Sequence, residues 1–193
     1  MLYINCTSSP TSGGVYLNAS ERIICDTLHL DTTILIEIRR FNSKPIEPFH
    51  YSLGRMIKDG KEYEVDPVRL QGILLEEENS KSYRLIYDLK NTLKSKGYTI
   101  FMLEKNFNID RKADGIDVLK TLDKYSIIKQ IGTAGINYDI TNDSLLTVIK
   151  QFDKKYSIDL IGASGDYCEF DIQNSPTDWK VFFKVMNSRM LYV

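Results

Sequence analysis

The chain of 193 residues has few of the side chains that most often do chemistry in proteins, with only two histidines, His29 and His50, and three cysteines. With so few histidines, the sequence offers no pairing of a nucleophile with a histidine base. The cysteines, Cys6, Cys25 and Cys168, are too few and uneven in number for the disulfide framework of a small secreted domain. These absences disfavour both a hydrolase with a histidine base and a disulfide-stabilised scaffold.

The sequence also lacks a basic excess and any long apolar run. Its net charge is −1, whereas nucleic-acid binders need a cationic face to displace counterions from phosphate. No apolar run approaches the ~20 residues of a membrane span. The start, Met1 to Cys6, shows neither the basic region nor the apolar stretch of a signal peptide. We therefore expect a cytoplasmic protein that binds neither nucleic acid nor membranes.

The composition is that of an ordinary globular protein, with 42% hydrophobic and 26% charged residues. The length fits one large domain or two small ones. We divide the chain into a β-rich region, residues 1–78, and an α/β domain, residues 79–193. The first region is either separate or part of the same domain.

The first half carries scattered strand and turn signals. The apolar, β-branched run Thr33 to Arg39 predicts a strand, and Arg69 to Glu76 predicts another. Between them, Lys58-Asp59-Gly60-Lys61 is typical of a tight hairpin turn, because Asp-Gly readily adopts positive φ.

The second half shows a consistent order of elements. Apolar residues recur at helical spacing over 81–96, Ser80 is the expected cap, and Gly97 is placed to end that helix. The remaining predicted elements are strands at 98–103, 115–122, 158–163 and 167–172, and helices at 124–131, from Asn142 to Tyr156, and at the C-terminal end.

The last helix has a marked start signal. Ser175 fits an N-cap, Pro176 the first helical position and Asp178 a residue that bonds back to the cap. We expect its apolar stripe to pack on the sheet, and this stripe comprises Trp179, Phe182, Phe183, Met186 and Met190. The predicted fold class is α+β, a mixed β-sheet with helices packed on it, plus a β-rich N-terminal portion.

Two polar turns are candidate ligand sites. In the loop 132–139, Gly135 precedes Asn137, Tyr138 and Asp139, and such a loop could turn backbone N–H groups toward an anion. The loop lacks the Lys-Ser/Thr of a phosphate-binding loop, and a plain glycine-rich connection is the favoured alternative.

The hairpin 162–171 brings Asp166, Glu169 and Asp171 near one another. Glu169 and Asp171 share a strand face, within reach for metal binding or acid–base work. Acidic residues on the solvated face of a hairpin explain the same pattern, and this alternative is favoured.

Neither a metal nor a cofactor is indicated elsewhere. Cys25 and His29 lack the further ligands of a zinc site, and no cofactor-binding motif occurs. The alternation of Cys168 with Phe170 points its thiol into the core, where it would be inert.

Four segments together resemble a known family. They are Gly135-Ile-Asn-Tyr-Asp-Ile140, Asp153-Lys-Lys-Tyr156, Ile161-Gly-Ala-Ser-Gly-Asp166 and Pro176-x-Asp178-Trp179. In this order and spacing they resemble bacterial domain-of-unknown-function family 4253 over about residues 80–190. The resemblance implies an α/β domain of cytoplasmic bacterial proteins without an established activity. The chain departs from it in having Tyr167 and Phe152 where many members have tryptophan, and in stopping at Val193 before the Cys-Pro-Asp stretch of the family.

The leading functional hypothesis is a non-enzymatic module that binds another protein, as toxin-neutralising immunity proteins do. The alternative is a small-molecule-binding domain or enzyme that uses the 132–139 loop and the 162–171 hairpin, because ligands often bind at such strand ends. The oligomeric state stays open.

Overall fold

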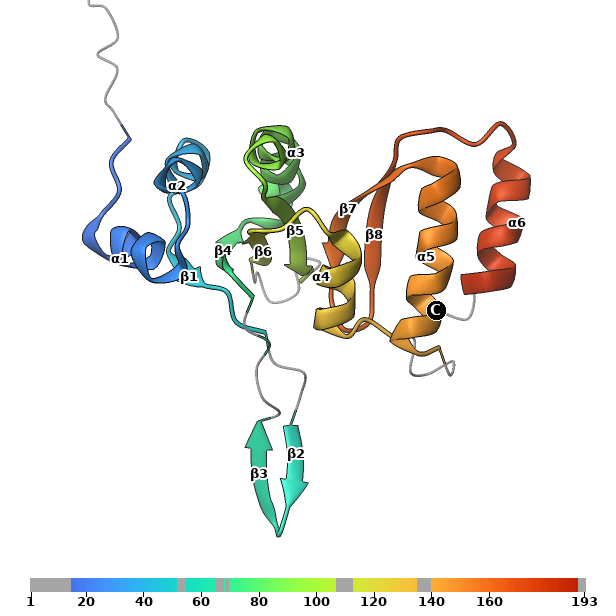
Figure 1. Cartoon of the computed structure of the whole chain (residues 1–193), viewed down its shortest axis with the longest axis horizontal. Helices are drawn as coiled ribbons and strands as arrows, with labels where there is room; N and C mark the ends of the chain where they lie inside the picture. The colour runs from blue at the N-terminus through green and yellow to red at the C-terminus, as the bar shows by residue number, and fades with distance from the viewer. Residues whose placement is uncertain are drawn as a thin grey trace, which may run out of the picture.

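A computed structural model describes residues 15–51, 55–64, 68, 70–106, 113–134 and 140–190. Within these ranges the chain forms a twisted mixed sheet with helices on both faces (Figure 1). The helices are α1 (Ala19–Leu28), α2 (Thr32–Arg39), α3 (Asn79–Ser95), α4 (Lys124–Ile131), α5 (Asn142–Tyr156) and α6 (Trp179–Met190). The strands are β1 (Ile46–Pro48), β2 (Arg55–Lys58), β3 (Lys61–Glu64), β4 (Gly72–Glu77), β5 (Thr99–Glu104), β6 (Asp114–Leu119), β7 (Ile158–Ala163) and β8 (Cys168–Ile172).

Six strands make the main sheet, in the order β1-β4-β6-β5-β7-β8. All neighbours pair antiparallel except β5 and β7, which run parallel. The predicted α+β fold is therefore confirmed. β1 and β4 join the same sheet as the strands that follow α3.

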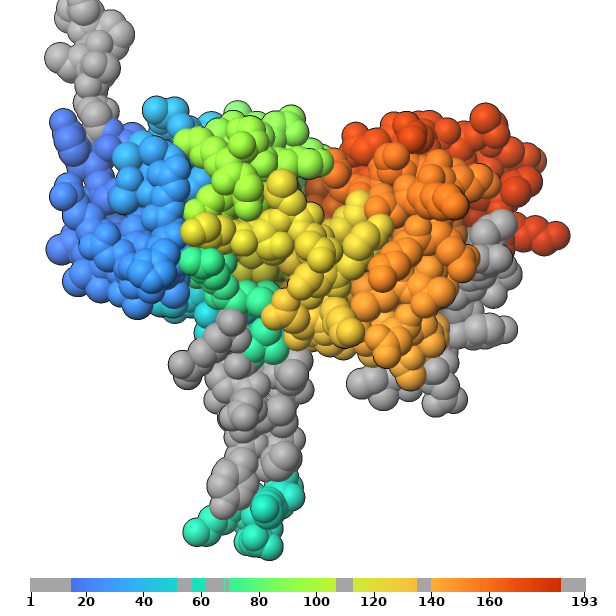
Figure 2. Space-filling model, viewed as in Figure 1, coloured from blue at the N-terminus to red at the C-terminus, as the bar shows by residue number. Residues whose placement is uncertain are grey.

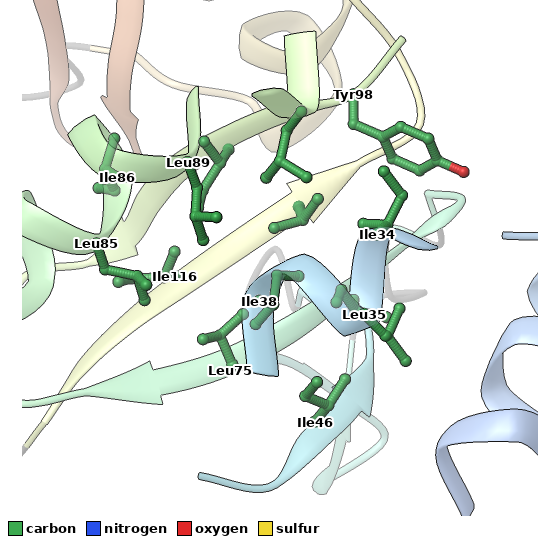
Figure 3. Packing of buried hydrophobic residues seen from close by; sticks show 14 of the residues in the cluster. Ile34, Leu35, Ile38, Ile46, Leu75, Leu85, Ile86, Leu89, Tyr98 and Ile116 are labelled. Carbon is green, nitrogen blue, oxygen red and sulfur yellow. The ribbon is translucent and has the colours of Figure 1, made fainter. Parts of the chain in front are cut away.

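The two faces of the sheet bury separate apolar cores, because successive residues of a strand point to opposite sides. In β5, Ile100 and Met102 face α1, α2 and α3, whereas Phe101 and Leu103 face α4, α5 and α6. Figure 3 shows the first core, in which α2 and α3 pack over the sheet. Its labelled residues are Ile34, Leu35, Ile38, Ile46, Leu75, Leu85, Ile86, Leu89, Tyr98 and Ile116.

The predicted strand Thr33 to Arg39 is wrong, because this segment lies in α2. Asp31 caps the helix by accepting a hydrogen bond from the Thr33 N–H. Ile34, Leu35 and Ile38 then fall on one face and are fully buried. A helix of only eight residues is held by this burial rather than by propensity, which for β-branched residues favours a strand.

The predicted elements from 81 onward are confirmed in type and order. Gly97 takes φ +87°, as its placement after α3 requires. Two predicted caps are wrong: Glu78 precedes α3 without a side-chain cap bond, and the Thr141 hydroxyl caps α5. The Asn142 amide instead donates to the carbonyls at residues 128 and 133, which fixes the entry of α5 against α4.

The start predicted for the last helix is also displaced. α6 begins at Trp179, and the Asp178 carboxylate accepts from the backbone N–H groups at positions 180 and 181. The helix lies beside α5 rather than flat on the sheet (Figure 1). Only Phe182 of its predicted stripe is buried, while Trp179 and Phe183 stay exposed. The expectation that all three aromatic rings pack on the sheet is therefore wrong for two of them.

Strands β2 and β3 form the predicted hairpin, which projects from the body of the molecule (Figures 1 and 2). Asp59 and Gly60 have φ +52° and +69°, the left-handed pair that a type I′ turn requires. In the described part of the chain these two strands pair only with each other.

Candidate functional site

The two turns predicted as ligand sites lie together. The Ala134 N–H donates to the Gly165 carbonyl at 2.9 Å, which joins the segment after α4 to the β7–β8 turn. This contact lies at the carboxyl ends of the parallel strands β5 and β7, where α/β sheets commonly bind ligands. Gly135, Asn137, Tyr138 and Asp139 lie outside the described residues.

Asp166 is exposed at the tip of the β7–β8 turn. Its carboxylate accepts a hydrogen bond from the Ser164 hydroxyl at 2.7 Å. The Ser164 oxygen in turn accepts from the Asp166 N–H at 3.4 Å. This local exchange is what a serine–aspartate turn makes for its own stability.

Glu169 and Asp171 share the face of β8 toward α3, as their alternation predicts, but both already have partners. The Tyr83 hydroxyl bonds the Glu169 carboxylate at 2.7 and 2.8 Å. Asp171 accepts from the Tyr87 hydroxyl at 2.7 Å and from the Lys90 ammonium at 2.5 Å. These bonds tie β8 to α3, so the two carboxylates act as anchors of the strand.

Lys105 completes the cluster around Glu169. Its ammonium lies 3.5 Å from the Glu169 carboxylate, bonds the Tyr83 hydroxyl and sits 4.9 Å from the centre of that ring. The hydrogen bond to Tyr83 raises the pKa of Lys105, and burial raises the pKa of Tyr83. Both groups keep their protons at neutral pH, which makes neither a nucleophile nor a general base there.

Asp117 is a buried acidic residue that the sequence analysis did not single out. It lies in the middle of β6, opposite Phe101 of β5, and is fully buried. Neither carboxylate oxygen has a hydrogen-bond partner in the described structure. Burial, and then the charge of Glu104, raise the pKa of Asp117 well above its ordinary value. An acidic residue inside the apolar run 115–119 was the available signal for this group.

The cysteines show no reactive or metal-binding arrangement. Burial raises the pKa of the Cys168 thiol to about 11, in line with the inert thiol expected from the sequence. Cys25 is buried in the first core, and its pKa is raised by burial as well. Among the residues that the structure describes, no cluster of three His, Cys, Asp or Glu could hold a metal ion.

An apolar groove opens between α5, α6 and β8. It encloses a cavity of about 250 Å³, lined by Ile149, Phe152, Ile158, Cys168, Glu169, Phe170, Ile172 and Phe182. The groove exists because α6 packs beside α5 and leaves the near face of β8 only half-covered. Its lining is almost entirely apolar, so it suits an apolar side chain better than a polar ligand.

Aromatic rings continue from this groove to the surface. Phe182 packs edge-on against Phe152 and Tyr156, with ring centroids 5.8 and 5.0 Å apart. Trp179 and Phe183 stack around the other side of Phe182 at 5.5 and 5.6 Å, and they are 46% and 56% exposed. We call these five residues the α6 aromatic cluster.

A smaller cavity of about 130 Å³ lies between α3 and α4 at the opposite end of the sheet. Three lysines line it, but each pairs with an aspartate: Lys90 with Asp171, Lys94 with Asp159, and Lys124 with Asp153. Because the lysine charges are neutralised in place, this cavity is a poor anion site.

Comparison with known proteins identifies one family. The model described as Domain of unknown function (DUF4253) matches residues 115–191, the span from β6 to the end of α6. The match confirms the resemblance seen in the sequence. No curated protein and no solved structure matches the chain. In the described ranges no helix has the length and apolar character of a membrane span.

Proposed function

Residues 115–191 carry a domain of unknown function (DUF4253) whose description names no activity, and from the geometry we propose a non-enzymatic protein-binding module. The single observation behind this proposal is the α6 aromatic cluster beside an open apolar groove. Contiguous exposed apolar surface is costly in water and marks interaction sites. Large aromatic rings also supply most of the binding energy at protein interfaces.

The binding site extends from Trp179 and Phe183 into the groove. A partner that covers the two exposed rings would also place an apolar side chain against Phe170 and Phe182. Such an interface has a central pocket and a surrounding aromatic surface, the arrangement in which interfacial hot spots occur. The polar groups nearby, including Glu169, are committed to α3 and leave no set for catalysis.

The biological setting of the proposal is a bacterial cytoplasm, and the class of protein is that of immunity proteins, which neutralise a toxin by covering it. This class fits a chain whose candidate site is a surface of rings rather than a polar pocket. It also fits the near-neutral charge of −1, which does not favour nucleic acid.

Trp179 provides a direct test, because it is the only tryptophan of the chain. Purified wild-type protein is used to capture partners from its own cell extract, in parallel with Phe183→Glu. A captured protein is then purified and titrated against the wild type. We expect a blue shift of the Trp179 emission and a loss of binding of ~10-fold or more for Phe183→Glu, since truncating a hot spot costs ~2 kcal/mol or more.

The matched control is Ile23→Glu, which places the same charge at another exposed apolar position, on α1. Partners that bind Phe183→Glu as tightly as they bind Ile23→Glu would contradict the proposed site.

A second candidate, a ligand site at the two polar turns, is supported by the Ala134–Gly165 hydrogen bond alone. It involves the predicted residues Gly135, Asn137, Tyr138, Asp139, Asp166 and Glu169. Amide chemical shifts of Asp166 and Ala134 that move on titration with phosphate or a nucleotide would favour it. Shifts confined to α6 on addition of the protein partner would favour the binding module.

A further inference from the structure

Two elements of the described structure stand without a partner strand. One is the β2–β3 hairpin, which projects into solvent (Figure 2). The other is β8, the last strand of the main sheet, whose outer edge pairs with no described strand. An isolated two-stranded hairpin is at best marginally stable in water, and an open edge strand is a ready template for another strand.

The hairpin carries an apolar residue and a basic residue side by side. Ile57 of β2 is 80% exposed, and the next residue, Lys58, is exposed as well. Successive strand residues point to opposite faces, so Ile57 and Lys58 point to opposite sides of β2.

β8 shows the matching pattern. On one face it offers Phe170 and Ile172 to the groove, and on the other face it carries Glu169 and Asp171. A strand added at this edge in the register of Ile57 would direct its isoleucine into the groove and its lysine beside the carboxylates. Opposite charges on neighbouring strands stabilise the pairing.

The charges at the hairpin tip support the same occupant. Lys58 and Lys61 lie directly opposite each other in the register of the hairpin. Like charges at such a position destabilise a hairpin on its own. A carboxylate surface beside the tip would remove this cost, and β8 supplies one in Glu169 and Asp171.

Donor and acceptor lie close together in each molecule. Tyr51 pairs with Val68 at the root of the hairpin, and the Tyr51 hydroxyl lies beside Gly165 of the β7–β8 turn. One copy therefore presents its hairpin next to its own β8 edge while the hairpin points away from the body (Figure 1). This arrangement suits reciprocal exchange between two copies related by a twofold axis.

We propose that this chain associates with a second copy of itself, with β2 of each hairpin added to the β8 edge of the other copy and Ile57 seated in the groove. The inference rests on the proposed function in using the same groove, and it names one occupant of that groove.

Sedimentation equilibrium of the purified full chain over a wide concentration range tests this assembly. The wild type is expected to form a dimer, and Lys58→Glu combined with Lys61→Glu to raise the dissociation constant ~10-fold or more. Ile57→Asp should have a similar effect. All three side chains are exposed at the hairpin, so these variants should keep the far-ultraviolet circular dichroism of the wild type.

Lys44→Glu combined with Lys129→Glu is the matched control, with the same change of charge at two exposed lysines outside the hairpin. It should dimerise as the wild type does. Dimerisation should also shift the Trp179 emission to the blue in the wild type.

A wild type that stays monomeric at all concentrations would overturn the proposed exchange, and so would a dimer that the hairpin variants leave intact. Either result leaves the proposed function standing if a foreign partner still requires Phe183. Conversely, hairpin-dependent dimers without any Phe183-dependent partner would retain the exchange and remove the proposed function.

Discussion

Gly162 of β7 and Tyr167 of the β7–β8 turn lie in direct contact across the end of the hairpin. A Cβ atom at Gly162 would meet the Cε2 atom of the Tyr167 ring at 2.9 Å. The ring is held in place because its hydroxyl donates to the Met102 carbonyl of β5 at 3.0 Å. The absence of a side chain at position 162 therefore lets Tyr167 fasten the turn to the parallel strand next to it.

Gly162→Ala is expected to destabilise the chain by ~1–3 kcal/mol, the usual cost of overpacking a rigid site. The added methyl group would push the Tyr167 ring away and break its hydrogen bond to Met102. Denaturant unfolding followed by circular dichroism measures the loss.

The matching control combines Gly162→Ala with Tyr167→Ala. If the ring is the obstacle, the alanine at 162 should cost clearly less in this background, since residues in contact do not act additively. An equal cost in both backgrounds would mean that the strain lies elsewhere.

Arg39 and Glu21 form a buried ion pair that joins α2 to α1. The side chains are only 13% and 4% exposed, and the Arg39 guanidinium also donates to the carbonyls of Asn42 and Lys44. Arg39→Met should cost ~3–5 kcal/mol in the free energy of unfolding, because it leaves the Glu21 carboxylate buried without its partner. Thermal or denaturant unfolding measures this cost.

The double variant Glu21→Leu with Arg39→Met separates the charge effect from the loss of packing. It should recover much of the stability, since buried pairs are often replaceable by apolar residues of similar volume. A double variant no more stable than Arg39→Met would show that the carbonyl contacts of Arg39 carry the effect.

The second half of the chain was readable from the sequence because its local signals agree with its packing. The strand 98–103 is apolar on both faces because β5 lies inside the sheet, with β6 and β7 beside it. Helix 124–131 and strand 158–163 were predicted with their observed bounds. In these segments periodicity, caps and burial all specify the same structure.

The first half was harder because tertiary contacts override local preference. Residues 33–39 are rich in threonine and isoleucine, which favour strands, yet they form α2 because Ile34 and Ile38 fit under α3 on one helical face. Nothing within seven residues reveals that contact.

The groove was beyond prediction for a related reason. Helical spacing gives α6 an apolar stripe, but spacing does not reveal how much of the stripe finds a surface to cover it. Phe182 is buried by Phe152 and Tyr156 of α5, while Trp179 and Phe183 extend past that helix. The sequence gave no sign of where the covering layer would stop.

Asp117 makes the stability of the chain depend on pH. Its pKa in the folded chain is raised well above 3.8 by burial, so the folded chain binds this proton more tightly than the unfolded chain. The free energy of unfolding should therefore fall as pH rises from about 3.8 toward the folded pKa, by ~1.4 kcal/mol for each unit of difference. Denaturant unfolding at a series of pH values should show this decline in the wild type and a weaker one in Asp117→Asn.

The exposed residue Asp26 supplies the control, since Asp26→Asn should leave the decline unchanged. If Asp117→Asn shows the same pH dependence as the wild type, the carboxyl group at 117 is not the titrating group.

Cys168 should react slowly with thiol reagents although it lines the groove. Burial raises its pKa from 9.0 to about 11, so the reactive thiolate is ~100-fold scarcer at neutral pH than in a free cysteine. In a chain with Cys6→Ser and Cys25→Ala, where Cys168 is the only thiol left, the rate with a disulfide reagent should be lower by about that factor than in the same chain unfolded in urea. A rate near that of a free thiol would show that the groove admits water deeply enough to ionise the sulfur. In that case the apolar character on which the proposed binding site depends would be lost.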